Sequence, residues 1–251
     1  MTLALHQRGL GKAFVFQHGL CGDARQTFEA APDLPGWQLF TLDCAGHGMS
    51  PPTPPFSIAR FSGDVTALIE TLPGPVVLGG ISMGAAIATR IAVKRPDLVR
   101  GLVLVRPAWG VEPSPPNMQP NAEVGRYLAA GAGRMAFENS PTARHLAQVA
   151  PDNLTSLLGF FDRHPLAVTS SLLTNISADG PGITGLDLAN LRLPVLVCGT
   201  AQDAVHPLTL ARDLAALIPA ARLIELPPKG ADKPVHLAAL HAAITEFLQE
   251  F

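Results

Sequence analysis

The chain has 251 residues, 47% of them hydrophobic, and its 18 basic and 20 acidic side chains give a formal net charge of −2. This composition is typical of a folded globular chain, and the length allows one large domain or one domain that carries an insertion. The sequence has no Lys/Arg cluster and no broad basic character. We therefore expect no nucleic-acid partner.

The segment Met1 to Lys12 lacks the continuous apolar run of a signal peptide, and no stretch approaches the roughly 18 apolar residues of a membrane span. We expect a cytoplasmic protein without a membrane span. Cys21, Cys44 and Cys198 show neither a C-x-x-C pair nor the His/Cys spacing of a zinc site. We expect reduced thiols, no metal and no other cofactor.

Short apolar runs bounded by turn residues alternate with segments of helical period, which is typical of buried parallel strands joined by helices. The expected strands are Ala13–Gln17, Gln38–Asp43, Val76–Ile81, Gly101–Val105, Val195–Cys198 and Arg222–Leu226. The alternation predicts an α/β fold with a mostly parallel sheet. Because ligands of such sheets bind beyond the carboxyl ends of the strands, the chemistry should lie in the loops that follow them.

The long stretch between Val105 and Leu193 has no strand-like run but holds four amphipathic segments: Ala122–Ala130, Thr142–Val149, Asn153–Phe161 and Leu166–Leu173. It is too long for an ordinary connection between strands. We expect a core domain of residues 1–106 and 191–251, with residues 107–190 inserted as a helical cap. Since few cap positions are basic and many are apolar, we expect a small, mainly apolar ligand.

Gly80-Ile81-Ser82-Met83-Gly84 is a G-x-S-x-G motif between an apolar run and an alanine-rich helical segment. Gly80 and Gly84 leave room for strand and helix to approach closely, so Ser82 can occupy a strained turn at the sheet edge. A helix N-terminus there would favour a developing anion. The motif predicts a nucleophilic serine, and the alternative is a glycine-rich turn without catalysis.

A serine hydroxyl needs a base to remove its proton and a carboxylate to orient that base. Asp203 follows the expected strand Val195–Cys198, which makes it the preferred acid. An Asp at this place could instead make an Asx turn. Glu112, at the entrance to the expected cap, is the second candidate.

His236 follows the last expected strand and stands where a loop meets the final helical segment. This is where the base of a serine nucleophile is expected. His241 lies a helical turn further into that segment, and His206 follows Asp203, where we expect it to cap or pack the next helix. His236 is therefore the preferred base.

An oxyanion needs two N–H donors, one from the residue after the nucleophile and one from a loop after an early strand. Met83 and Leu20 are the natural pair, and Gly19 permits the loop conformation. We expect His18 to organise this loop rather than act as a base. Asp43 and His47 are expected to hold the neighbouring turn by hydrogen bonds, with a direct role in catalysis as the alternative.

Taken together, His18-Gly19, Asp43-x-x-Gly46-His47-Gly48-x-Ser50, Gly80-x-Ser82-x-Gly84, Asp203 and His236 resemble the α/β-hydrolase superfamily over nearly the whole chain. The resemblance implies an eight-stranded, mostly parallel sheet flanked by helices, a helical cap, and a Ser82–His236–Asp203 triad that forms an acyl-enzyme. The chain departs from many members in one respect. Their histidine stands in a Gly-His pair well before the final helix, whereas here Val235 precedes His236.

We expect hydrolysis of a carboxylic ester, thioester or lactone of a small molecule. Carbon–carbon bond hydrolysis, perhydrolysis and acyl transfer use the same nucleophile and stay open, as does a ligand-binding protein with little turnover. Ser82 argues against the members of the superfamily that use a carboxylate at this position. The sequence gives no prediction of the oligomeric state.

Overall fold

The computed structural model describes residues 2–251, in which a single sheet has seven strands in the order β1-β3-β2-β4-β5-β6-β7. β1 pairs antiparallel with β3, and all other neighbouring strands are parallel. The strands are β1 Leu5–Gly9, β2 Gly11–Gln17, β3 Gly36–Leu42, β4 Val76–Ile81, β5 Val99–Val105, β6 Val195–Thr200 and β7 Ala221–Leu226.

The predicted α/β fold with a mostly parallel sheet is confirmed. The expected number of eight strands is wrong for the described residues, which form seven. That number came from the resemblance alone. β1 and β2, separated only by Leu10, use most of the residues before the first crossover, so no further strand has room there. β1 itself was not predicted, because its alternating, half-exposed residues lack the apolar run of a buried strand.

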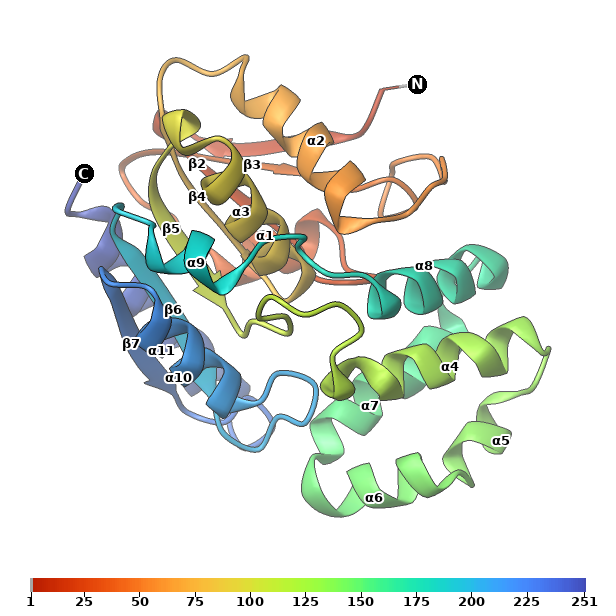
Figure 1. Cartoon of the computed structure of the whole chain (residues 1–251). Coiled ribbons are helices and arrows are strands. Elements are labelled where there is room, and N and C mark those ends of the chain that lie inside the picture. The colour runs from red at the N-terminus through yellow and green to blue at the C-terminus, as the bar shows by residue number, and fades with distance from the viewer. Residues whose placement is uncertain (1) are drawn as a thin grey trace.

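Helices cover both faces of the sheet (Figure 1). One face carries α2 (Ile58–Ile69), α3 (Met83–Lys94) and α10 (Leu208–Leu217), whose buried apolar residues form one core cluster with the strands. The other carries α1 (Ala24–Ala30) and α11 (Lys233–Leu248), which contribute to a second cluster. Every residue of β4 is buried, so helices cover this strand on both faces of the sheet.

Between β5 and β6 the chain forms a separate helical layer beside the sheet (Figure 1). Its elements are η2 Pro116–Met118, α4 Gln119–Ala129, α5 Arg134–Glu138, α6 Pro141–Val149, α7 Pro151–Gly159, η3 Phe160–Asp162 and α8 Leu166–Ala178. The layer has its own apolar cluster, centred on buried Val124, Phe137 and Leu173. Its amphipathic segments lie within α4, α6, α7 with η3, and α8, as the sequence predicts.

The two ends of this helical layer are tied together at one residue. Trp109 Nε1–H donates to the Asp179 carbonyl at 2.9 Å, and the Asp179 carboxylate accepts from the Ile58 N–H at 2.7 Å. The chain then returns to the sheet through α9 (Gly185–Ala189), which buries Leu188 in the main cluster. Earlier in the chain, the short η1 (Pro96–Leu98) connects α3 to β5. The division at residues 107 and 190 stays a prediction.

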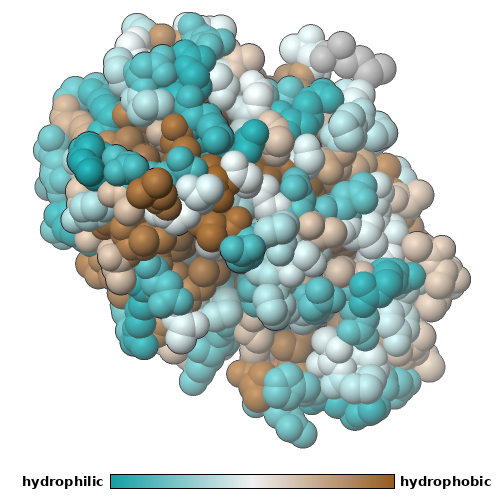
Figure 2. Space-filling model, viewed as in Figure 1, coloured by the Kyte–Doolittle hydropathy of each residue, from teal (hydrophilic) through white to brown (hydrophobic). Residues whose placement is uncertain are grey.

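The surface over α9 and α10 is apolar in the view of Figure 2, and the exposed apolar side chains of these helices include Leu186 and Leu217.

Within residues 2–251 no helix is both long and apolar enough to cross a membrane. Cys21, Cys44 and Cys198 are free thiols.

Candidate active site

Ser82 lies at the sharp turn between β4 and α3. Its backbone has φ 54° and ψ −109°, a conformation that residues other than glycine rarely adopt. The strand and helix leave no space for a larger residue at Gly80 or Gly84, since a Cβ on either would collide with neighbouring backbone atoms. The Ser82 N–H donates to the Val105 carbonyl at 3.0 Å, which anchors the turn to β5.

The loop after β2 lies next to this turn because Gln17 pairs with Gly80 across the sheet. Gly19 approaches Ser82 so closely that a Cβ at Gly19 would lie 3.5 Å from the Ser82 Cβ. The Gly19 N–H is held by the Gln26 side chain at 2.7 Å. Among the hydrogen bonds of the described chain, none is donated by the N–H of Leu20 or Met83.

His18 is fully buried and holds two loops together. Its Nδ1–H donates to the Gly19 carbonyl at 2.8 Å, and its Nε2 accepts from the Cys44 N–H at 3.1 Å. Burial lowers the pKa of His18, although the nearby Asp43 opposes this effect. Both ring nitrogens of the neutral imidazole are therefore occupied, which fits the expected role in organising the loop.

Asp43 and His47 also make hydrogen bonds within the loops. Asp43 accepts from the N–H of Ala24 and of Met49, each at 2.9 Å, and contacts His6 Nε2 at 2.9 Å. His47 donates to the Ala45 carbonyl at 3.1 Å and lies 4.8 Å from the His18 ring, centroid to centroid. Burial holds the pKa of His47 well below its ordinary value.

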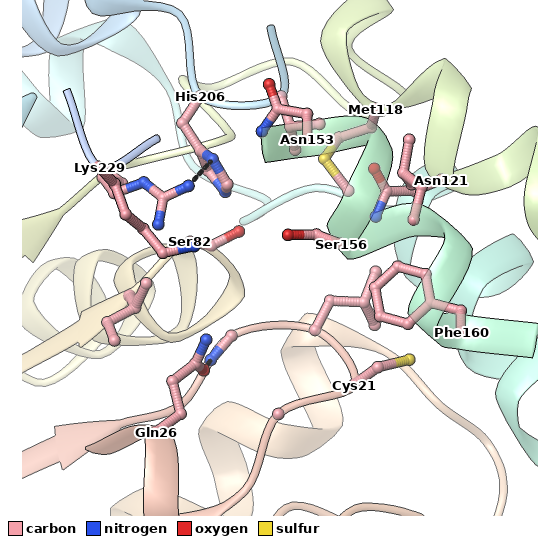
Figure 3. A pocket seen from close by; sticks show the side chains of 17 residues that line it. Cys21, Gln26, Ser82, Met118, Asn121, Asn153, Ser156, Phe160, His206 and Lys229 are labelled. Carbon is pink, nitrogen blue, oxygen red and sulfur yellow. Dashed lines mark hydrogen bonds between the residues drawn. The ribbon is translucent and has the colours of Figure 1, made fainter. Parts of the chain in front are cut away.

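A cavity of about 200 Å³ opens over Ser82, between the sheet edge and the helical layer (Figure 3). Its polar wall is formed by Gln26, Ser82, Arg106, Asn121, Asn153, Ser156, His206 and Lys229. Apolar side chains line the rest: Leu20, Cys21, Ile81, Met118, Leu157, Phe160 and Val205. The Ser156 hydroxyl points toward the Ser82 hydroxyl across this space (Figure 3).

Asp203 lies in the loop after β6 and is almost fully enclosed by donors. Its Oδ2 accepts from Arg106 Nε at 2.9 Å and Nη2 at 2.6 Å. Its Oδ1 accepts from Asn153 Nδ2 at 2.9 Å and from the His206 N–H at 3.0 Å. Burial alone would raise the pKa of Asp203, but His206, Arg106 and Asn153 hold it well below its usual range.

The histidine in contact with Asp203 is His206. Its Nδ1 lies 3.0 Å from each carboxylate oxygen of Asp203, and His206 lines the same cavity as Ser82 (Figure 3). Burial lowers the pKa of His206, the Asp203 carboxylate opposes this effect, and Arg106 adds to it. From the sequence, His206 was expected to cap or pack the next helix.

His236 lies in the first turn of α11 and is buried. Its Nδ1–H donates to the Pro227 carbonyl at 2.8 Å, and burial lowers its pKa. It lines a second cavity with Glu29, Leu237 and Leu240, and does not line the cavity over Ser82. No hydrogen bond of the described chain joins His236 to Asp203, whereas His206 both contacts Asp203 and lines the cavity over Ser82. The role of His236 as the base stays a prediction.

Arg106, at the end of β5, has φ 45°, and its N–H donates to the Cys198 carbonyl at 2.7 Å. The ion pair with Asp203 fixes the side chain of this strained residue. Sequence analysis did not identify Arg106 as part of the site. Lys229, which pairs with Asp152 at 3.1 Å, adds a second cation to the cavity wall. The i, i+3 spacing of Asp203 and His206 was the one sequence signal for this cluster.

The family model described as alpha/beta hydrolase fold matches residues 12–232. The chain is 28% identical to BpoC of Mycobacterium tuberculosis over 249 residues, covering 92% of this chain and 90% of BpoC. It is 30% identical to the pimeloyl-[acyl-carrier protein] methyl ester esterase of Chromobacterium violaceum, covering 74% of this chain and 73% of the esterase.

A third similarity, 35% identity to the mouse sn-1-specific diacylglycerol lipase ABHD11, covers 47% of this chain and only 38% of that protein. Among solved structures, a thermophilic esterase from Thermogutta terrifontis superposes with a TM-score of 0.75 at 24% identity, covering 99% of this chain and 93% of the esterase. At this identity the structural similarity shows the fold alone.

Proposed function

The chain belongs to the alpha/beta hydrolase fold family, and on that premise we propose that it is a serine hydrolase that cleaves a small carboxylic ester through an acyl-enzyme on Ser82. The family and its esterase and lipase relatives support a hydrolase. The ester bond and the covalent intermediate are our inference from the chemistry of the site.

The observation that carries this proposal is the placement of Ser82. A strained backbone at the N-terminus of α3 presents its hydroxyl to a cavity, and the hydroxyl has no hydrogen-bond partner in the described chain. Strain at such a turn is maintained only where the surrounding structure enforces it. The close contacts at Gly80 and Gly84 enforce it here, which is the arrangement expected for a preorganised nucleophile.

Two backbone N–H groups are available to stabilise the anion. Leu20 lines the cavity, and Met83 begins α3, where the positive end of the helix dipole lies. Because neither N–H donates elsewhere in the described chain, both can bind the oxygen of a tetrahedral intermediate. Asp203 is the acid that orients the base.

The size of the cavity favours a small substrate. A volume of about 200 Å³ holds a short acyl chain, and Met118, Leu157 and Phe160 give that chain apolar contacts. The polar wall opposite, with Asn121 and Ser156, suits a substrate that also carries an oxygen or nitrogen atom. Methyl and other short alkyl esters, and small lactones, meet both conditions.

The proposal is tested with a fluorophosphonate probe and with p-nitrophenyl esters of graded acyl length. We expect the probe to modify Ser82, and Ser82→Ala to retain its fold by circular dichroism while activity falls to the level left by binding and the oxyanion site, roughly 10³–10⁴-fold over water. Full activity of Ser82→Ala would contradict the proposal. Ligand binding without turnover in the wild type would indicate a binding protein, and diversion of the acyl group to added alcohol would indicate an acyltransferase.

A further inference from the structure

We propose that His206, and not His236, is the general base that takes the proton of Ser82, an inference that rests on the proposed serine-hydrolase function. Ser82 and His206 line the same cavity (Figure 3). His236 lines the neighbouring cavity instead. Arg106 and Lys229 contribute to the walls of both cavities.

The tautomer of His206 follows from its partner. The Asp203 carboxylate can only accept hydrogen bonds, and it lies 3.0 Å from Nδ1 through both oxygens. The Arg106 Nη2 also lies 3.2 Å from Nδ1, but it donates to the Asp203 Oδ2 at 2.6 Å, and both carboxylate oxygens lie closer to Nδ1 than Nη2 does. We therefore assign the proton to Nδ1, which leaves the lone pair on Nε2. No hydrogen bond in the described chain uses Nε2, so it is free to accept the serine proton.

The Asp203 loop holds His206 in place. The Asn153 side chain donates to Asp203 at 2.9 Å and accepts from the Ala204 N–H at 2.7 Å, and the His206 N–H itself donates to Asp203. Because α7 of the helical layer supplies Asn153, the geometry of the base depends on the layer that covers the site. An orienting group held in this way is what a catalytic base requires.

His236 lacks this support. Its Nδ1–H donates to a neutral carbonyl, that of Pro227, and a carbonyl stabilises an imidazolium less than a carboxylate does. Within residues 2–251 no hydrogen bond joins the Ser82 hydroxyl to either histidine. In unliganded sites such bonds often form only when substrate is present.

Ser82, His206 and the two N–H donors account for every bond and proton of ester hydrolysis. The Ser82 oxygen bonds to the ester carbonyl carbon while its proton moves to His206 Nε2, and the carbonyl oxygen becomes an anion held by the N–H groups of Leu20 and Met83. The bond to the leaving alkoxide then breaks, and Nε2–H returns the proton to the alkoxide. Water then attacks the acyl carbon and gives one proton to Nε2. The bond from that carbon to the Ser82 oxygen breaks, Nε2–H returns the proton to the Ser82 oxygen, and the carboxylic acid leaves.

The test compares the rate at which the fluorophosphonate probe modifies Ser82, followed by mass spectrometry of the intact protein. His206→Asn keeps an amide donor for Asp203 but removes the Nε2 base, so we expect a fall of about 10²–10⁴-fold. His236→Asn should stay within about threefold of the wild type. The control is His241→Asn, since His241 contacts only the Glu29 carbonyl in the described chain.

The outcomes separate this inference from the function on which it rests. A wild type that is not modified at Ser82 would overturn the function itself. Modification lost in His236→Asn and kept in His206→Asn would overturn the assignment of the base and leave the function intact. If both variants lose modification, added imidazole should restore His206→Ala alone, and any other pattern of rescue would overturn the assignment.

Discussion

Arg106 and Asp203, 97 positions apart in the sequence, form a buried ion pair in which two guanidinium nitrogens contact one carboxylate oxygen. The side chain of Asp203 is 4% exposed and that of Arg106 is 12% exposed, so water screens this pair little. Its remaining carboxylate oxygen is available to Asn153 and His206. The pair therefore fixes the loop after β6 to the end of β5.

Replacing Arg106 should destabilise the fold. In Arg106→Met the Asp203 carboxylate stays buried without its cation, and breaking a buried pair in this way costs about 3–5 kcal/mol. Urea unfolding at pH 7 measures this loss. The double variant Arg106→Met/Asp203→Asn should recover part of it, since no charge is then left unpaired. Equal stability of the Arg106→Met variant and the wild type would contradict a structural role for the pair.

Asp203→Asn should lower kcat by up to about 10⁴-fold, because an amide can hold the imidazole in the wrong tautomer and cannot stabilise the imidazolium. The matched control is Glu112→Gln, which removes one carboxylate from an exposed position outside the cavity. Steady-state kinetics with a p-nitrophenyl ester should show near-normal kcat for the control. A larger effect at Glu112 would place the acid at the start of the helical layer.

The pH profile of kcat/KM should have its acid-side midpoint below 6.5, the ordinary pKa of histidine. Burial lowers the pKa of His206, the facing carboxylate of Asp203 raises it, and the cations of Arg106 and Lys229 lower it further. Since the neutral imidazole is the active form, activity is lost as the pH falls through this pKa. Stopped-flow measurements from pH 4.5 to 8 on an enzyme that stays folded check the midpoint. A midpoint above 7 would contradict the burial argument.

Burial lowers the pKa of His236 as well. The midpoint therefore tests whether a buried histidine acts as the base, and the probe experiment decides which one.

Asn121 is the residue of the helical layer that we expect to affect substrate choice. It is 6% exposed, it lines the cavity, and its Oδ1 has no hydrogen-bond partner in the described chain. A substrate with an N–H or O–H group can satisfy this oxygen. For such esters Asn121→Leu should raise KM by about tenfold, which corresponds to one hydrogen bond. For p-nitrophenyl acetate, which lacks a donor, kinetics should change by less than about twofold. An equal effect on both substrates would indicate a packing role.

The α/β fold, the mostly parallel sheet and the turn at Ser82 could all be predicted from the amino-acid sequence. Each of these depends on local patterns. A buried parallel strand is a continuous apolar run, and G-x-S-x-G between such a run and a helix leaves few conformations for the serine. β1 was not predicted, because its half-exposed residues, Leu5 to Gly9, form no continuous apolar run.

The side chains that line the cavity over Ser82 come from distant parts of the chain, and the sequence did not predict this set. His206 and His236 both follow late strands, and the sequence favoured His236 because it stands where a loop meets the final helix. The loop after β6 is held by Arg106, just after β5, and by Asn153 from α7, and its His206 lines the cavity over Ser82. These partners lie 97 and 50 positions from Asp203, and contacts over such distances follow from packing between elements and from no local pattern.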